Sequence, residues 1–293
     1  MSPKNQFLRL CTIATLLCIT TAICPKVSAQ GEIRQNDPEE PGVVSYTFRN
    51  QFSDDAEGTL ETIKEMGFTH IELSSLFGKS AEEMKNLLDE HFLICTSYGI
   101  GYNDLLENPD RAAEEANTLG ARFVRVAWIP HEEPFTKEDA DRAIRDFETA
   151  GKVLNEHGLQ LLYHNHGYEF RPHDGKTLFD YLVQNSNPKY LNFQMDTFWV
   201  AHPGFDPVEL LNRYPQRFYL VHLKDLAIEA ELGFSGNTPP DYDVPLGEGQ
   251  VDFEGVMEAA EKSNIRHFYI EDETEDVLRR VPQSLQYIRS LVD

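Results

Sequence analysis

Residues 161–170 combine side chains that can bind a metal or move protons. An apolar run ends in His164-Asn165-His166, and a carboxylate, Glu169, follows three residues later. On a β-strand alternate side chains share a face, so His164 and His166 would point the same way. Imidazole nitrogens beside a carboxylate can bind a divalent metal or transfer protons. The alternative for this segment taken alone is a surface loop with two solvated histidines.

Polar side chains also stand at the ends of four other expected strands. These are Glu72, Asp196, His222 with Lys224, and Glu271. If the strand ends share one rim, a divalent cation can bind among them and keep positions open for substrate oxygens. The expected ligands are His164, Asp196, His222 and Glu271. Each alone also has an ordinary alternative, such as a turn cap, a core histidine or part of a charged surface run.

These strand ends belong to a regular alternation of short apolar runs and longer amphipathic ones. Strands are expected at 43–48, 70–73, 93–98, 123–128, 159–166, 191–196, 218–224 and 267–271. Helices are expected at 56–66, 80–91, 110–119, 136–157, 177–185, 207–214, 253–263 and 282–291. Eight strand–helix pairs over about 250 residues predict an α/β fold, a single-domain (β/α)8 TIM barrel. The alternative is an open doubly wound sheet, but no Gly-x-Gly-x-x-Gly follows the first strand.

The connection at 226–252 is long and contains four glycines and three prolines. A loop of this length and composition inside a compact domain is usually a lid or a binding loop. It follows the seventh strand, on the face where barrel active sites form. We therefore expect it to gate the site.

Residues 1–29 have the features of a secretory signal peptide. Lys4 and Arg9 accompany an apolar run, and Val27-Ser28-Ala29 fits a small-residue cleavage site. The run is shorter than the roughly 20 residues that span a bilayer, and lipidation at Cys24 is a further alternative. We expect cleavage after Ala29 and a periplasmic or extracellular location. The expected division is a signal peptide at 1–29, a flexible leader at 30–41 and the barrel at 42–293.

The charge of the expected mature chain argues against polyanionic partners. The first 29 residues hold three of the 26 basic residues and none of the 49 acidic ones, which leaves a net charge of −26. Such a surface repels nucleic acid and anionic membranes. We expect no nucleic-acid partner and no integral membrane segment after cleavage, and the oligomeric state stays open. Cleavage would leave Cys95 as a single cysteine, so no internal disulfide is expected.

Four segments together carry a family resemblance that spans essentially the whole mature chain. They are Tyr163-His164-Asn165-His166-Gly167-Tyr168-Glu169-Phe170, Met195-Asp196-Thr197-Phe198-Trp199, His222-Leu223-Lys224-Asp225 and Pro245-Leu246-Gly247-Glu248-Gly249-Gln250-Val251-Asp252-Phe253. They resemble the sugar phosphate isomerase/epimerase family of the xylose isomerase-like TIM-barrel superfamily. The resemblance implies one divalent metal ion (Mn, Mg, Co or Zn), with Asp196, His222 and Glu271 in ligand positions. The fourth ligand of the family is often a glutamate where His164 stands, so His164 or Glu169 would complete the set.

The resemblance also implies a small-molecule sugar as the substrate. His202 matches a substrate-binding histidine of related epimerases, and Lys224 lies near the place of a cationic group that faces substrate oxygens. Trp128 and Trp199 can stack on a sugar face, although each can equally be a core residue. Glu72 completes the expected substrate contacts.

The expected chemistry is proton transfer next to the carbonyl of a keto sugar, with stabilisation of the enediolate. Glu169, His166 and Glu271 are the acid/base candidates; the alternative for Glu169 is a loop anchor that pairs with Arg171 or Lys176. Return of the proton isomerises or epimerises the sugar, whereas loss of a leaving group, as from a 3-keto-glycoside, makes the enzyme a lyase. Export and strong negative charge favour an unphosphorylated substrate. A sugar-binding barrel without turnover is the alternative outside enzymes.

Overall fold

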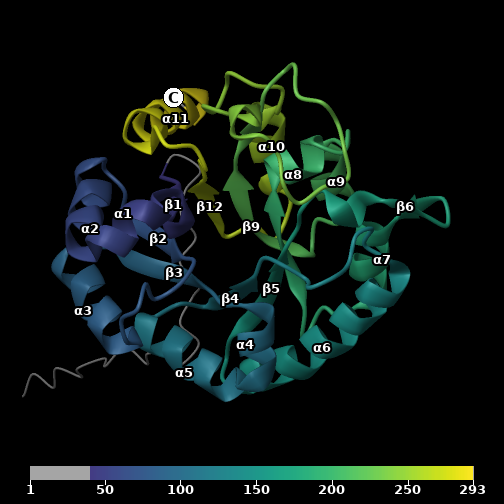
Figure 1. The fold of residues 1–293 in the computed structure, drawn as a ribbon, viewed down its shortest axis with the longest axis horizontal. Helices are drawn as coiled ribbons and strands as arrows, with labels where there is room; N and C mark the ends of the chain where they lie inside the picture. The colour runs from purple at the N-terminus through teal and green to yellow at the C-terminus, as the bar shows by residue number, and fades with distance from the viewer. Residues whose placement is uncertain (1–39, 293) are drawn as a thin grey trace, which may run out of the picture. The chain divides into compact units, whose positions relative to one another are not determined.

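The computed structural model describes residues 40–292 (Figure 1). Eight parallel strands close into a barrel in the order β1-β12-β9-β8-β5-β4-β3-β2, and helices surround it (Figure 1). This arrangement confirms the predicted (β/α)8 TIM barrel. The barrel strands are β1 (Gly42–Val44), β2 (His70–Leu73), β3 (Ile94–Gly99), β4 (Phe123–Val126), β5 (Gln160–His164), β8 (Asn192–Asp196), β9 (Phe218–Leu223) and β12 (His267–Ile270).

The outer helices begin where the sequence supplies caps. Ser80, Thr136 and Thr177 open three helices with capping boxes, in which the cap hydroxyl and the carboxylate three residues later satisfy each other's backbone N–H groups. The helices are α1 (Arg49–Asp54), α2 (Ala56–Glu65), α3 (Ala81–Glu90), α4 (Tyr102–Glu107), α5 (Pro109–Leu119), α6 (Lys137–Glu156), α7 (Leu178–Asn185), α8 (Thr197–Ala201), α9 (Pro207–Arg213), α10 (Phe253–Ala260) and α11 (Val277–Val292). Within the described residues, no helix has the length and apolar character needed to cross a membrane.

The barrel strands present an apolar layer followed by a polar one. Phe123, Leu162, Leu220 and Tyr269 form a small buried apolar cluster of their own. His164 and His222 lie two residues beyond Leu162 and Leu220 on β5 and β9, so they share the face of the strand that carries this cluster. The histidines therefore stand on an apolar floor at the carboxyl ends of the strands.

Several boundaries differ from the sequence-based expectation, and those of the first strand and the last helix differ most. The first strand ends at Val44, and Ser45–Phe48 form a 3-10 helix, η1, instead of continuing the strand. The Ser45 hydroxyl accepts a hydrogen bond from the backbone N–H of Ser74 at 2.8 Å, which holds this turn against the end of β2. The last helix begins at Val277, so Pro282 lies inside it rather than at its start. Proline marks a helix start only as a tendency, and here the helix tolerates the lost N–H.

The long connection after β9 is partly regular. Its start, β10 (Asp225–Leu226), pairs antiparallel with β11 (Asp243–Val244), and a short 3-10 helix, η3 (Pro240–Tyr242), precedes β11. A second small hairpin joins β6 (Pro172–His173) and β7 (Lys176–Thr177). The Asp225 carboxylate accepts hydrogen bonds from the backbone N–H groups of Leu226, Gly247, Gly249 and Val251. One buried side chain therefore ties both ends of the connection together.

Candidate active site

The carboxyl ends of the strands surround a pocket of about 580 Å³. Its wall combines imidazoles, aromatic rings and charged groups, and residues of the long connection after β9 contribute one side. The chemically distinctive lining residues are His164, His166, His222, Trp128, Phe198, Trp199, Arg49, Arg125, Lys224, Asp243, Glu271 and Glu273.

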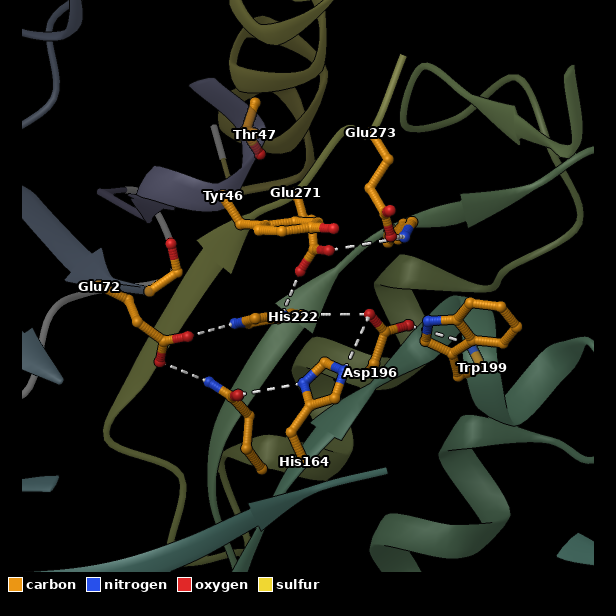
Figure 2. A network of polar contacts seen from close by, with 12 residues as sticks. Tyr46, Thr47, Glu72, His164, Asp196, Trp199, His222, Glu271 and Glu273 are labelled. Carbon is orange, nitrogen blue, oxygen red and sulfur yellow. Dashed lines mark hydrogen bonds and ion pairs between the residues drawn. The ribbon is translucent and has the colours of Figure 1, made fainter. Parts of the chain in front are cut away.

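His164, Asp196 and His222 form a buried cluster on three adjacent strands, β5, β8 and β9. One ligand atom from each lies within 4.8 Å of the others. Asp196 Oδ2 lies 3.9 Å from His164 Nε2 and 4.0 Å from His222 Nδ1, and it accepts no hydrogen bond from the described residues (Figure 2). A buried carboxylate oxygen without a donor is costly unless a cation completes its environment. The three residues therefore fit the implied divalent metal ion.

Glu271 and Lys224 extend this cluster. Glu271 Oε2 contacts His222 Nδ1, and Glu271 Oε1 lies 3.5 Å from Lys224 Nζ. Burial would raise the pKa of Glu271, but Lys224 and His222 hold it well below its usual range. Burial would lower the pKa of Lys224, but Glu273 and Glu271 hold it well above its usual range. Both side chains are therefore charged, and Glu271 is placed for either predicted role, metal ligand or acid/base group.

His166 lies beside His164, just past the end of β5. Its ring centroid is 5.0 Å from that of His164, 5.3 Å from that of Trp128 and 5.2 Å from that of Trp199. Burial and the charge of Lys224 lower the pKa of His166 to about 3, so its imidazole is neutral near pH 7. A neutral imidazole in the pocket wall can accept a proton from a bound substrate.

Glu72 does not line the pocket; it lies behind the cluster and is completely buried. Glu72 Oε1 lies 2.9 Å from His222 Nε2 and accepts a hydrogen bond from Arg125 Nε at 3.0 Å. Burial would raise the pKa of Glu72, but Arg125 and His222 lower it to about 2. This position supports His222 and corrects the expectation of a direct substrate contact.

Glu169 also lies away from the pocket wall. Its buried carboxylate accepts hydrogen bonds from the Tyr163 hydroxyl and from the backbone N–H of His166, the latter at 3.1 and 3.0 Å. Burial raises the pKa of Glu169 to about 8. The structure thus places Glu169 as an anchor of the loop after β5, with Tyr163 and His166 as partners instead of the expected Arg171 or Lys176. The predicted general-base role has no support from this placement, nor does the alternative role as fourth ligand.

The other expected substrate contacts divide into two groups. Trp128 and Lys224 line the pocket, and the Lys224 ammonium lies 5.0 Å from the Phe198 ring centroid. His202 does not line it; the ring stacks on Phe198 at 6.1 Å, and its carbonyl accepts the Gly233 N–H at 3.1 Å. His202 therefore supports the long connection after β9.

Several pocket residues carried no recognisable sequence motif. They are Tyr46, Arg49, Ser74 and Tyr102. Tyr46 and Arg49 belong to η1 and α1, where the sequence predicted strand or loop. Asn165, between the two histidines, was also missed: its side-chain oxygen accepts the Asp196 N–H at 3.1 Å. In a TIM barrel every strand-to-helix connection can contribute to the active site. This general rule would have predicted most of these residues.

Comparison with known proteins agrees with this architecture. A family model described as a xylose isomerase-like TIM barrel matches residues 60–291. An inosose dehydratase from Lacticaseibacillus casei is 24% identical over 258 residues, which cover 77% of this chain and 84% of that protein. An inosose dehydratase from Geobacillus kaustophilus is 25% identical over 191 residues, 57% of this chain. That match spans 61% of the Geobacillus protein, less than two thirds of its length.

Two solved structures share the fold. A sugar phosphate isomerase/epimerase from Parabacteroides distasonis matches with a TM-score of 0.70 at 21% identity, over 90% of this chain and 98% of that chain. A xylose isomerase-like TIM-barrel protein from Mycobacterium smegmatis, in complex with magnesium, matches with a TM-score of 0.66 at 16% identity, over 86% of this chain and 96% of that chain. At these identities the likeness shows a common fold.

Proposed function

This chain belongs to the xylose isomerase-like TIM-barrel family, as its motifs predicted, and we propose that it is a divalent-metal-dependent isomerase or epimerase of an unphosphorylated keto sugar. The observation that carries the proposal is the buried Asp196 Oδ2, which faces His164 and His222 without a donor among the described residues. These three residues would hold the cation, with Glu271 beside them. Bound there, a divalent cation polarises a carbonyl and stabilises developing negative charge.

Two proton carriers flank the cluster. Glu271 follows β12 and His166 follows β5, at the two ends of the strand series β12-β9-β8-β5. An ionised carboxylate or a neutral imidazole can each remove the C–H proton next to the substrate carbonyl, which gives an enediolate. Return of that proton at the neighbouring carbon isomerises the sugar. Delivery of a proton to the opposite face, by the second carrier, epimerises it.

The pocket wall supports a neutral substrate. Its cations are already engaged: Arg125 by Glu72, Lys224 by Glu271 and Glu273, and Arg49 by backbone carbonyls. A phosphate group would need uncommitted cations or a cradle of backbone N–H groups. Trp128 and Trp199 instead present aromatic rings to the pocket, which suit the apolar faces of a sugar.

Elimination of water is the second candidate outcome. Two relatives that align with this chain are named inosose dehydratases, and the two-carrier arrangement also suits their reaction class. One carrier would take the C–H proton and the other would protonate the departing hydroxyl, so that a C–H and a C–O bond break, a C=C bond forms and water leaves.

The test is proton exchange on a panel of keto sugars and keto cyclitols in deuterated water, followed by NMR with Mn, Mg, Co or Zn supplied in turn. We expect the C–H signal next to the carbonyl to disappear, with an isomer, an epimer or an unsaturated product identifying the outcome. His166→Gln and Glu271→Gln should each slow exchange by roughly 10²–10⁴-fold, whereas the exposed Glu90→Gln serves as the control. Ligand binding with no exchange on any compound would instead support a sugar-binding barrel.

The proposal includes export from the cytoplasm, with cleavage after Ala29. Its support is the sequence of residues 1–29 alone, which lie outside the described residues. Because sugar phosphates are cytosolic metabolites, an exported enzyme would meet unphosphorylated sugars, in agreement with the engaged cations of the pocket.

A further inference from the structure

The two histidines of the cluster face Asp196 through different ring nitrogens. His164 does so with Nε2 at 3.9 Å, and His222 with Nδ1 at 4.0 Å. A neutral imidazole carries one N–H, and the other nitrogen offers the lone pair that binds a metal. To offer a lone pair toward Asp196, His164 must therefore be protonated on Nδ1 and His222 on Nε2. The site needs opposite tautomers of two neighbouring residues.

The remaining ring nitrogens lie on one chain of hydrogen bonds (Figure 2). Glu72 Oε1 lies 2.9 Å from His222 Nε2, and Glu72 Oε2 accepts from Gln194 Nε2 at 2.8 Å. Gln194 Oε1 in turn lies 3.1 Å from His164 Nδ1. Arg125 donates to Glu72 Oε1 from Nε at 3.0 Å and lies 2.9 Å from it with Nη2. All these side chains are buried.

The donor and acceptor of each of these hydrogen bonds follow from the Glu72 carboxylate. A carboxylate paired with Arg125 only accepts, so it requires an N–H from His222 and the NH2 group of Gln194. Gln194 must then present its carbonyl oxygen to His164, and His164 must donate from Nδ1. We infer that Glu72 is a positioning residue that fixes a proton on His222 Nε2 directly and, through the Gln194 amide, a proton on His164 Nδ1. The inference rests on the proposed metal site, but the tautomers themselves do not depend on turnover.

Glu72→Gln should reverse the direction of the hydrogen bonds that run from residue 72 through Gln194 to His164. The new amide keeps its oxygen toward Arg125 and His222, which both donate, and turns its NH2 toward Gln194. Gln194 then has to rotate, so that its own NH2 faces His164 Nδ1. His164 must accept there and carry its proton on Nε2, the nitrogen that faces Asp196. A nearly isosteric change at position 72 would thus disable a ring that it does not touch.

The exchanged pair Glu72→Gln/Gln194→Glu should restore the original pattern. The amide at position 72 donates to the carboxylate at position 194, whose second oxygen accepts the Nδ1–H of His164. The double variant has the same net charge as the natural chain and a similar volume. Recovery in this variant separates the bonding pattern from a general loss of packing.

The experiment reads histidine tautomers by ¹⁵N NMR in the metal-free full chain with labelled histidine, because protonated and unprotonated ring nitrogens resonate far apart. His164 is the better reporter, since His222 has a carboxylate at both nitrogens. We expect Nδ1–H in the natural chain, Nε2–H in Glu72→Gln and Nδ1–H again in the exchanged pair. Zn²⁺ affinity, measured by competition with a chromophoric chelator, should fall roughly 10–100-fold in the single variant and recover in the pair.

Persistence of the Nδ1–H form of His164 in Glu72→Gln would overturn the inference. Should Glu72→Gln not fold, Gln194→Met removes the relay while Glu72 stays, and a mixture of His164 tautomers is then expected; a single Nδ1–H form would again overturn it. If the tautomers switch as expected but the natural chain binds no Zn²⁺, the tautomer relay stands and the proposed metal-dependent function fails.

Discussion

The two carboxylate oxygens of Asp196 have different roles, one structural and one in the proposed metal site. Oδ1 accepts the backbone N–H of Trp199 at 2.9 Å and so caps α8, while Oδ2 is buried without a donor among the described residues. The cap fixes the rotation of the side chain, which holds Oδ2 between His164 and His222. The sequence left two interpretations of Asp196 open, a turn cap and a metal ligand, and this geometry lets one residue perform both.

Asp196→Asn tests that division. The amide oxygen can still accept the Trp199 N–H, so the fold should persist, but an NH2 group in place of Oδ2 would repel a cation. We expect divalent-metal affinity to fall by at least about a hundredfold, the upper end of what even supporting residues contribute. Titration with Zn²⁺ and thermal unfolding of the metal-free protein measure the two effects. Glu90→Gln, an exposed acid at the end of α3, is the control, and full metal occupancy in Asp196→Asn would reject the site.

Glu169 makes the pH dependence of stability testable. Burial raises its pKa from 4.5 to about 8, so the folded protein binds this proton more tightly than the unfolded chain does. The resulting stabilisation is complete below about pH 4.5 and is lost as the pH rises through about 8. Glu169→Gln removes the titration, so the free energy of unfolding should fall less steeply between pH 5 and pH 8. Urea unfolding at several pH values measures the slope; an unchanged slope would contradict the buried, protonated carboxyl.

The same residues show what could be predicted at this scale. His164, Asp196 and His222 end neighbouring strands, and the rule that barrel strands share a carboxyl-end rim was enough to bring them together. Glu72 ends its strand in the same way, yet the sequence does not reveal that Arg125 and Gln194 bury it behind the rim. The sequence likewise does not reveal that Glu169 binds the Tyr163 hydroxyl and the His166 N–H instead of facing the pocket, because side-chain packing decides this.

Among the elements, the connection after β9 is the one that most shapes the pocket. Asp225 secures its base, and its middle part rests on the aromatic side chains of the rim. A Cβ at Gly236 would lie 2.5 Å from the Trp128 ring and 3.0 Å from that of Tyr168, so the backbone touches the rings directly. The sequence predicted a gating loop from length and composition, and the close approach at Gly236 gives that prediction a specific contact.

Gly236→Ala should therefore lift this segment from Trp128. Overpacking of this kind typically costs about 1–3 kcal/mol, which a surface connection can avoid by moving away, so the global unfolding temperature should change little. We expect kcat/KM on an active keto sugar to fall by about tenfold. Gly233→Ala is a matched control in the same segment, because its Cβ would meet His202 only at an ordinary 3.6 Å. Equal kinetics for the two variants would argue against a gate at Gly236.

The number and order of the barrel strands followed from the sequence, whereas several boundaries and the short helices α1, α4 and α8 did not. Apolar runs bounded by caps and glycines located all eight barrel strands, because each strand is buried on both faces. The turn at Ser45–Phe48 was not predicted because its residues are also compatible with a strand, whereas a contact with Ser74, at the end of the neighbouring strand β2, helps to decide its shape. Tertiary contacts of this type override local preference.

At the scale of the whole molecule, the barrel and the charge have separate consequences. Closure of the strands brings residues as far apart as Glu72 and His222 to 2.9 Å, which no local motif encodes. The net charge of −23 for the full chain does not determine the fold, but it disfavours polyanionic partners. Both features agree with an enzyme of small neutral molecules.

Export remains a prediction of the sequence. The amino terminus of the exported protein tests it. Cleavage after Ala29 leaves 264 residues that begin at Gln30. In a small-x-small site the last residue before the cut must be small, whereas the residue before it is less restricted. Ala29→Trp should therefore block processing, and Ser28→Trp should still permit it. Intact mass of the exported protein distinguishes the forms; a chain that still begins at Met1, or a lipidated Cys24, would reject cleavage at Ala29 and weaken the case for a substrate met outside the cytoplasm.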